Sequence, residues 1–315
     1  MFSITTRDLT RSYGKLVAVD HLNLKIPTGS LFGLIGPNGA GKTTTLRMLA
    51  GLLEPSCGEI RVNELSTKQY WNEIQWQIGF MPDFFGVYED LLVWEYLDFF
   101  ARCYKLEPNR RQLVTQELLE LVDLTEKRDA FVHTLSRGMR QRLCLAHALI
   151  HDPQVLLLDE PASGLDPRAR VEMRELLREL RNMGKTILLS SHILTELAEL
   201  CDHVAIMERG KLVISAPIDE ILRRASEHRR FTIQVLNDTQ RVEQILRNSP
   251  AVREIIYEAG QNQGNKIEIE FSGTDEAAAS LLESLVAQQV RVAAFGELNN
   301  NLEEAFLRLT KGEVA

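Results

Sequence analysis

The sequence predicts an α/β fold with a mixed sheet core, an inserted helical subdomain and a small C-terminal α+β domain. The apolar run 31–35 ends in a glycine-rich turn followed by a helical pattern. The runs 155–158 and 186–189 are continuously apolar, which is typical of parallel strands buried on both faces. Ahead of these two strands, residues 91–150 show helical spacing throughout, which indicates helices inserted into the sheet.

The remaining elements of the first half follow from local patterns. Alternating apolar positions predict two antiparallel strands, Ile4–Thr10 and Leu16–Ile26, closed by a turn at Pro27–Gly29. A helix is expected at Thr43–Leu53, and further short strands at Gly58–Val62 and Ile78–Met81. Pro167 begins a charged amphipathic helix that runs to Met183.

A change of character near the charged run Arg223–Arg230 predicts a domain boundary, with domains at residues 1–222 and 223–315. The C-terminal domain is expected to resemble a split βαβ sandwich. Its predicted elements are strand 231–236, helix 239–247, strand 252–258, strand 266–271, helix 274–288, strand 290–295 and helix 299–310.

Composition excludes some classes of protein. The 315 residues are 44% hydrophobic and 25% charged, close to globular averages. A net charge of −8 argues against broad nucleic-acid binding, so we expect no nucleic-acid partner. The N-terminus lacks a signal-peptide pattern, and no apolar run is long enough to span a membrane, so any membrane association requires a partner. The four separated cysteines predict buried thiols rather than metal ligands or disulfides.

The glycine-rich turn fits the pattern GxxxxGK[ST] for triphosphate binding. Its glycines allow backbone N–H groups to point at phosphates, and the following helix N-terminus favours an anion. Lys42 is expected to reach the β- and γ-phosphates, and the Thr43 hydroxyl to ligate Mg²⁺. The predicted ATP-binding residues here are Gly36, Pro37, Asn38, Gly39, Ala40, Gly41, Lys42, Thr43 and Thr44.

Two acids follow the apolar strand 155–158, at the edge of a parallel sheet where ligands bind. Asp159 is expected to hold Mg²⁺ through water, and Glu160 to polarise the attacking water. Two acids that merely cap a strand are the alternative, which the nearby phosphate loop disfavours.

The segment 135–142, Leu-Ser-Arg-Gly-Met-Arg-Gln-Arg, lies about twenty residues before the acidic strand. By itself it is a helix N-cap with a basic first turn. In combination with the phosphate loop and the acids, it resembles the LSGGQ signature of the ATP-binding cassette (ABC) family. The resemblance covers roughly residues 1–218 and implies a P-loop NTPase cassette.

The resemblance implies roles for further residues. Tyr13 lies where the family stacks an aromatic ring on adenine, and Ser163–Asp166 matches a loop that communicates between two sites of a dimer. His192 matches the switch histidine at the γ-phosphate, whereas a lone histidine after a strand is more often a surface residue. Ser136, Gly138 and Asp166 are therefore expected at the nucleotide, and His192 is expected to act in catalysis with Glu160 and Lys42.

Three departures from the family pattern stand out. Arg137 and Met139 replace glycine and glutamine of the signature, while Ser136 and Gly138 are retained. Asp83 replaces the glutamine of the family's Q-loop and, being shorter and anionic, is expected to approach Mg²⁺ only through water or after a shift of the loop.

The resemblance also implies partners. In the family, the signature closes over ATP bound to a second subunit, so we expect a dimer, with a homodimer favoured. We further expect an integral membrane permease subunit and a peripheral location at the cytoplasmic face of the inner (plasma) membrane. The aromatic segment Phe84–Tyr88 and the helix from Val93 either receive the permease's coupling helix or form ordinary core. Residues 295–310 resemble the tail of bacterial exporter cassettes.

Three functions are compared. The first is the ATP-hydrolysing motor subunit of an exporter, which fits a single cassette without a membrane span. The second is an ABC-type ATPase acting on the ribosome or DNA, whose usual second cassette or long insertions are missing. The third, a nucleotide-binding module without turnover, is disfavoured because Lys42, Asp159, Glu160 and His192 are all present.

Overall fold

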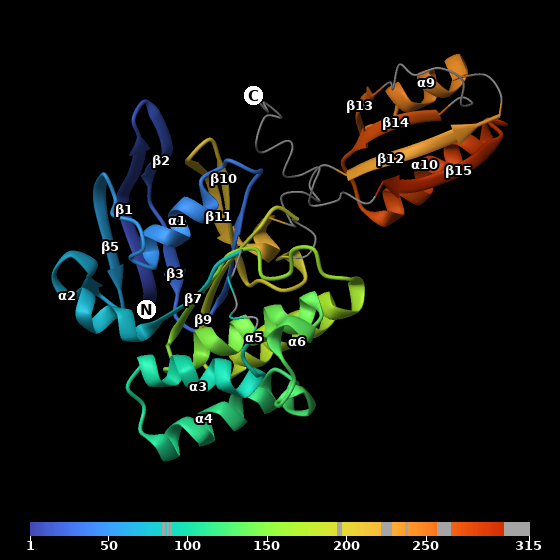
Figure 1. The fold of residues 1–315 in the computed structure, drawn as a ribbon. Coiled ribbons are helices and arrows are strands. Elements are labelled where there is room, and N and C mark those ends of the chain that lie inside the picture. The colour runs from blue at the N-terminus through green and yellow to red at the C-terminus, as the bar shows by residue number, and fades with distance from the viewer. Residues whose placement is uncertain are drawn as a thin grey trace. The chain divides into compact units, whose positions relative to one another are not determined.

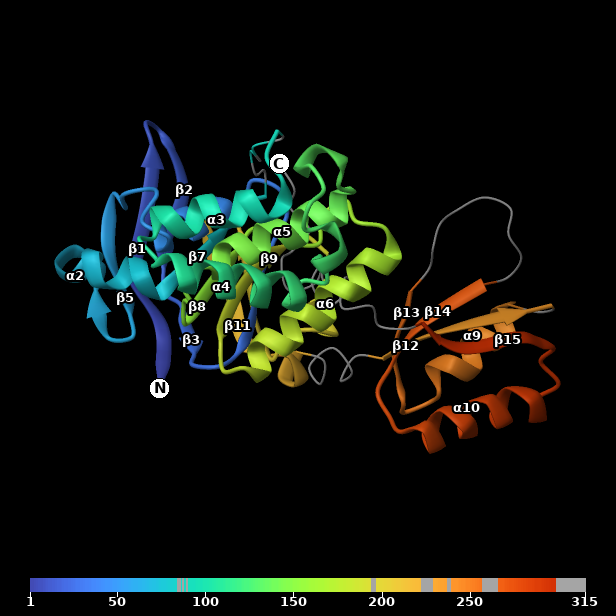
Figure 2. The same cartoon turned by 60° about the horizontal axis from the view of Figure 1, so that its bottom comes forward.

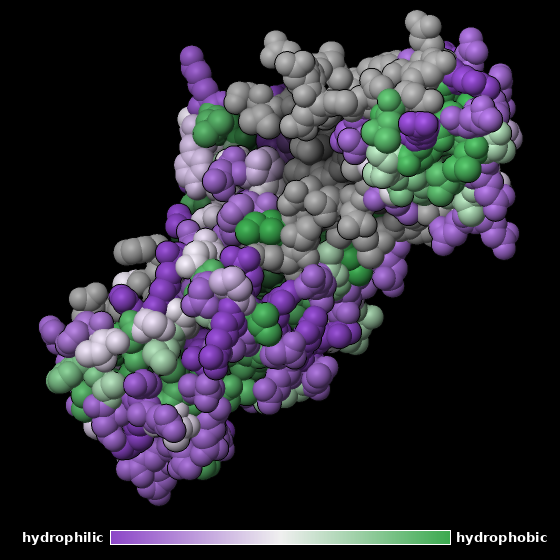
Figure 3. All heavy atoms as spheres, turned by 90° about the vertical axis from the view of Figure 1, so that its right-hand side faces the viewer, coloured by the Kyte–Doolittle hydropathy of each residue, from purple (hydrophilic) through white to green (hydrophobic). Residues whose placement is uncertain are grey.

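The computed structural model describes residues 1–83, 86, 88, 90–193, 197–221, 229–236, 239–256 and 266–298. The chain divides into two compact units, Met1–Ile218 and Asp219–Ala315, which we call the cassette and the C-terminal unit (Figure 1). The boundary expected after residue 222 stays a prediction. On the face drawn in Figure 3, hydrophilic side chains predominate over the cassette, and hydrophobic surface gathers on the C-terminal unit.

The first layer of the cassette is an antiparallel sheet with strand order β2-β1-β5-β6, in which β3 also pairs with β1. Its strands are β1 Phe2–Tyr13, β2 Leu16–Leu22, β3 Lys25–Pro27, β5 Cys57–Val62 and β6 Leu65–Ser66. The single strand predicted at 16–26 was wrong. The Thr6 hydroxyl donates to Leu22 O and accepts from Leu24 N, so it interrupts the ladder between β2 and β3.

The second layer is a six-stranded sheet with strand order β11-β10-β4-β9-β8-β7, parallel except for the antiparallel β11 at its edge. Every residue of β4, β8 and β9 is buried, which confirms the prediction from their continuous apolar runs. The strands are β4 Leu31–Ile35, β7 Ile78–Met81, β8 Val155–Leu158, β9 Thr186–Ser191, β10 His203–Glu208 and β11 Lys211–Pro217. Because these strands run parallel, their carboxyl ends meet at one edge.

The helices of the cassette include an inserted group, as predicted, in which α4 packs against both α3 and α5 (Figure 2). The α-helices are α1 Lys42–Leu49, α2 Thr67–Ile74, α3 Val93–Cys103, α4 Pro108–Leu121, α5 Arg137–Leu149 and α6 Pro167–Asn182. Short 3-10 turns lie at η1 Gln75–Gln77, η2 Thr125–Lys127 and η3 Val132–Thr134. None of the described helices is long and apolar enough to cross a membrane.

The C-terminal unit is a βαββαβ arrangement with an antiparallel sheet of order β13-β14-β12-β15. Its elements are β12 Arg229–Val235, α9 Thr239–Arg247, β13 Val252–Ile256, β14 Lys266–Phe271, α10 Asp275–Ala287 and β15 Val292–Leu298. Alternate residues of β12 and β14 pack with both helices in one apolar cluster, so the helices cover the same face. The predicted helix 299–310 lies outside the described residues.

The cysteines correct one expectation. Cys144 and Cys201 are buried, and burial raises the pKa of the Cys144 thiol to about 12. Cys57 and Cys103 are exposed, because they lie at the start of β5 and the last residue of α3. The prediction that all four are buried was therefore wrong.

Candidate functional site

The phosphate loop lies between β4 and α1, and its backbone requires glycine at two close approaches. A Cβ atom on Gly36 would lie 2.4 Å from the carbonyl oxygen of Met207. Gly41 has φ +101°, and a Cβ there would lie 2.5 Å from the carbonyl oxygen of Ala18. Only glycine fits such contacts, so the loop backbone stays turned ahead of the helix that begins at Lys42.

Lys42 is directed back into the loop. Its side chain is only 6% exposed, and Nζ donates to Gly36 O at 2.6 Å and to Pro37 O at 3.3 Å. Nζ also lies 3.6 Å from Glu160 Oε1. Burial lowers the pKa of Lys42, and the neighbouring Glu160 carboxylate opposes that shift. The cation is thus enclosed by oxygen atoms at the position expected for terminal phosphates.

Asp159 follows β8 and is 2% exposed. Its Oδ1 accepts hydrogen bonds from the hydroxyls of Thr43, at 3.1 Å, and Ser190, at 2.7 Å. Its backbone N–H donates to Met81 O, at the end of β7, at 2.8 Å. The hydroxyl of Thr43 and the carboxylate of Asp159 therefore meet, although 116 residues separate them. Hard oxygen donors of this kind suit Mg²⁺.

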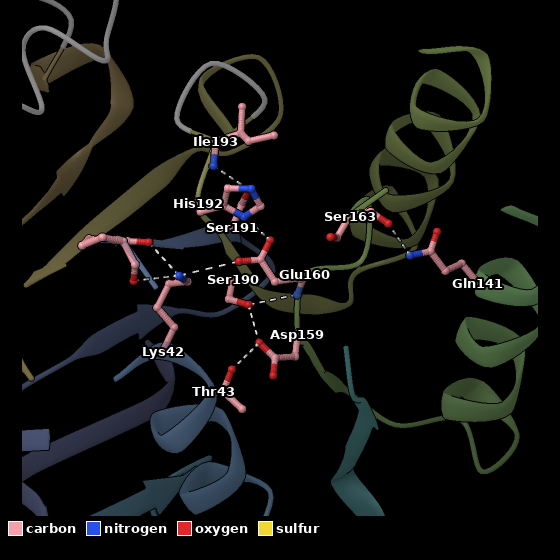
Figure 4. Close-up of polar contacts among 12 residues, drawn as sticks. Lys42, Thr43, Gln141, Asp159, Glu160, Ser163, Ser190, Ser191, His192 and Ile193 are labelled. Carbon is pink, nitrogen blue, oxygen red and sulfur yellow. Dashed lines mark hydrogen bonds and ion pairs between the residues drawn. The ribbon is translucent and has the colours of Figure 1, made fainter. Parts of the chain in front are cut away.

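Glu160 contacts three other residues at the carboxyl edge of the six-stranded sheet, as Figure 4 shows. Its Oε2 lies 2.9 Å from His192 Nδ1, its Oε1 faces Lys42, and its backbone N–H donates to Ser190 Oγ at 3.0 Å. Glu160 has φ +50°, a left-handed conformation that is uncommon for a residue other than glycine. We call Lys42, Thr43, Asp159, Glu160 and His192 the edge cluster.

The signature residues form a second group. Ser136 caps α5, and its side chain accepts from Met139 N at 3.3 Å. Asp166 caps α6 and accepts from Ala169 N at 2.9 Å. Gly138 lies against α6, because a Cβ on it would be 3.0 Å from that of Ala169. The structure gives none of these three a contact with the edge cluster among the described residues.

Two further predicted residues also lie apart from the edge cluster. Tyr13 ends β1, is 46% exposed, and has the Arg11 guanidinium 4.8 Å from its ring centroid. Asp83 is exposed two residues beyond β7, and no hydrogen bond or ion pair joins it to another described residue. Its contact with a metal ion therefore stays a prediction.

Two buried residues at the site were missed by sequence reasoning. Ser190 is fully buried and bonds to both acids. Gln141 is 2% exposed and donates from Nε2 to Ser163 O at 3.2 Å, which joins α5 to the loop before α6. The available signal for Ser190 was a polar residue directly after the apolar run 187–189 of a buried strand, because a buried polar group needs a partner. Gln141 lies between Arg140 and Arg142, so its burial had no such signal.

The geometry defines a class of protein. A glycine-rich loop before a helix N-terminus, a buried lysine and a hydroxyl–carboxylate pair together suit a nucleoside triphosphate with a divalent metal ion. The carboxylate of Glu160 adds an acceptor for a proton of water. The fold and site are those of a P-loop ATPase.

Comparison with known proteins identifies the family. The model of the family described as ABC transporter matches residues 19–163. The chain is 40% identical to the bacitracin transport ATP-binding protein BcrA of Bacillus licheniformis, over 74% of this chain and 76% of that protein. It is 33% identical to the Nod factor export ATP-binding protein I of Ralstonia nicotianae, over 99% of this chain and 94% of that protein. The chain therefore belongs to the ABC transporter family, as an ATP-binding and ATP-hydrolysing subunit.

A solved structure agrees with this assignment. An ATP-binding subunit of an ABC transporter, 29% identical in sequence, superimposes with a TM-score of 0.64 and covers 72% of this chain and 94% of that one. The family assignment confirms the predicted P-loop ABC fold and the ATPase that powers transport. It decides against an ATPase that acts on the ribosome or DNA.

Proposed function

We propose that this chain hydrolyses ATP at a composite site formed by two copies and thereby drives export through an integral membrane permease. The observation that carries the proposal is the separation of the two groups of residues. The edge cluster is assembled within one chain, whereas Ser136 and Gly138 of the signature make no contact with it among the described residues. A second copy supplies the signature that one chain does not bring to its own phosphate loop.

The proposed chemistry assigns each residue of the edge cluster a role. Thr43 and Asp159 hold Mg²⁺, the latter through water, and Mg²⁺ supplies positive charge at the phosphates. Glu160 accepts a proton from water as the water oxygen bonds to the γ-phosphorus, and the bond from that phosphorus to the β–γ bridging oxygen breaks to release ADP. Lys42 stabilises the charge on the phosphates, and His192 holds Glu160 and contacts the γ-phosphate.

The remaining residues contribute to binding in this proposal. The loop from Gly36 to Thr44 surrounds the phosphates, Tyr13 stacks on adenine, and Asp166 contacts the site of the other copy. Exposure of the Tyr13 ring at the end of β1 is compatible with stacking. Asp83 approaches the metal ion through water from the end of β7.

The direction of transport and the partner rest on the relatives. The Nod factor protein is named for export and the bacitracin protein for transport, and the former matches the chain almost from end to end. We infer a permease in the membrane and a peripheral position at its cytoplasmic face. The C-terminal unit is proposed to stabilise the dimer or regulate it.

Replacing Glu160 with Gln tests the catalytic proposal. The amide cannot accept the proton, so we expect ATP turnover to fall by at least about 100-fold, as for loss of a general base. ATP should then hold the variant as a dimer in light scattering after size-exclusion chromatography. Glu175→Gln, which only disturbs an exposed ion pair with Arg178 on α6, is the matched control. Unchanged turnover in Glu160→Gln would contradict the role of Glu160, and a monomer with bound ATP would contradict the composite site.

The partner is tested separately. Tagged chain is recovered from detergent-solubilised membranes, and we expect an integral membrane protein with it. Recovery of ribosomal proteins in its place would argue against the permease.

A further inference from the structure

Strand β9 and the residue that follows it present two side chains, Ser190 and His192, to the acids at the sheet edge. β9 lies between β4 and β8, with Ser190 paired to Leu34 and Leu189 paired to Leu158. Ser190 therefore lies one position beyond Leu158, level with Asp159. His192 is two residues further, just beyond the end of β9, and its Nδ1 lies 2.9 Å from Glu160 Oε2. Figure 4 shows Ser190 directed at Asp159 and at the backbone of Glu160, and His192 directed at the carboxylate of Glu160.

The Ser190 hydroxyl makes two different bonds. It donates its hydrogen to Asp159 Oδ1 at 2.7 Å and accepts the backbone N–H of Glu160 at 3.0 Å. A hydroxyl has one hydrogen to donate, and here that hydrogen is given to the carboxylate. Ser190 is fully buried, so water does not compete for either bond. One hydroxyl thus fixes the side chain of the first acid and the backbone of the second.

The bond to Glu160 also bears on the backbone conformation. Glu160 has φ +50°, which a residue with a side chain adopts only when its surroundings hold it there. Ser190 Oγ is the acceptor that satisfies the Glu160 N–H in this conformation. From it, the carboxylate reaches both Lys42 and His192.

The bond to Asp159 orients that carboxylate. Oδ1 accepts both the Thr43 and the Ser190 hydroxyls, at 3.1 Å and 2.7 Å. Two donors on one oxygen fix the plane of the carboxylate, and so fix the direction of Oδ2. Loss of the Ser190 donor would leave Thr43 alone to hold the carboxylate.

We propose that Ser190 is a positioning residue for ATP hydrolysis, which holds Asp159 toward the metal ion and Glu160 toward the attacking water. The proposal rests on the roles given above to these two acids. It differs from a merely structural role, in which the hydroxyl satisfies buried polar groups and affects only the stability of the fold.

Replacing Ser190 with Ala tests the proposal. We expect kcat to fall and the Mg²⁺ concentration for half-maximal activity to rise, each by about 10- to 100-fold, as when a residue that orients a metal ligand is removed. The KM for ATP should stay within about threefold, because the phosphate loop and Lys42 are untouched. Ser190→Thr, which keeps the hydroxyl, should recover most of kcat and the normal Mg²⁺ requirement.

A matched control lies next to it on the strand. Ser191 is also buried, but its hydroxyl accepts from Ile193 N at 3.0 Å, which is a contact outside the acids. Ser191→Ala should leave the Mg²⁺ requirement unchanged. If Ser190→Ala does not fold, Ser190→Cys, which is close to serine in size and only a weak hydrogen-bonding group, should show the same shift in Mg²⁺ requirement.

The outcomes separate this proposal from the one on which it rests. A lowered melting temperature with unchanged kcat and Mg²⁺ requirement in the folded Ser190 variants would overturn the positioning role, provided Glu160→Gln is inactive. Full activity of Glu160→Gln would instead overturn the assignment of the catalytic base.

Discussion

The six-stranded sheet of the cassette and the antiparallel sheet of the C-terminal unit place polar residues in opposite ways. In the cassette, β4, β8 and β9 are buried throughout, so their charged neighbours lie beyond the strand ends. In the C-terminal unit, one face of the antiparallel sheet packs on helices, and the other carries polar residues such as Glu268, whose Oε1 lies 2.9 Å from Lys266 Nζ. Polar groups gather at an edge in the first sheet and spread over a face in the second.

The difference follows from strand direction. Parallel strands place all their carboxyl ends at one edge, which brings together residues that are far apart in the sequence. Antiparallel strands alternate their ends, so the same number of strands produces no comparable convergence. We therefore expect core changes in the C-terminal unit to lower ATP turnover less than comparable changes in the cassette, because the C-terminal unit bears on turnover only through the dimer or regulatory role proposed for it.

The largest effect on stability should come from an aromatic core residue in each unit. Phe271, in β14, is fully buried, and Phe32, in β4, is 1% exposed. Replacing either with Ala should destabilise its unit by about 3–5 kcal/mol, because the change removes buried area and leaves a cavity. Phe32→Ala should lower ATP turnover by the larger factor, since β4 leads into the phosphate loop.

Calorimetry with resolved transitions, alongside an ATPase assay, measures both quantities. An equal loss of turnover in Phe271→Ala would break the comparison and show that the two units are energetically coupled.

The second largest difference between the units should be the effect of low pH on their stability. His147, on α5, stacks on Phe100 with ring centroids 3.7 Å apart, and burial lowers its pKa to about 4. The unfolded chain binds the proton near pH 6.5, so stability is intact above that pH and falls as pH drops toward 4, by about 3 kcal/mol in total. The described residues of the C-terminal unit contain no histidine.

The measurement is urea unfolding of the cassette between pH 7 and pH 4. His147→Asn should reduce the pH dependence, whereas His133→Asn, at an exposed position, should retain it. If the pH dependence of the stability is unchanged in His147→Asn, it arises from groups other than His147.

The smallest effects should come from helix caps, of which we compare one in each unit. Asp166 caps α6 by accepting from Ala169 N at 2.9 Å, and Thr274 caps α10 by accepting from Ala277 N at 3.4 Å. Replacing either with Ala should cost about 1 kcal/mol, because one N–H of the first turn loses its acceptor. Asp166→Ala should lower turnover as well, through the dimer contact proposed for its loop.

Thermal unfolding and ATPase assays on the two variants test this pair. If Asp166→Ala loses the expected stability but keeps normal ATP turnover, Asp166 acts only as a helix cap.

The sequence predicts those parts of the fold that depend on local patterns. The helix 239–247 and the strand 266–271 have the bounds that their periodicity predicts. The break between β2 and β3 was not predicted, because it depends on the hydroxyl of Thr6, which bonds across the sheet to residues 22 and 24. Local spacing carries no information about such a contact.

The same distinction applies to the site. The phosphate loop and the acids were found because their residues are adjacent in sequence. Ser190 was missed because its importance depends on bonds to Asp159 and Glu160, which follow β8, 31 and 30 residues earlier in the chain, and only the sheet register brings them together. The exposure of Cys57 and Cys103 likewise depends on where their elements begin and end.

The contact between Lys42 Nζ and Glu160 Oε1, at 3.6 Å, has a consequence for nucleotide exchange. A phosphate oxygen that binds Lys42 would compete with this carboxylate for the ammonium group, so Glu160 is a competitor of the substrate. Incoming ATP must displace that competitor, and the displaced carboxylate is then free to face water. Departing products are replaced on the lysine by the same group, which favours their release. The carboxylate that competes with nucleotide for Lys42 would thus be the same group that must face water in the next turnover.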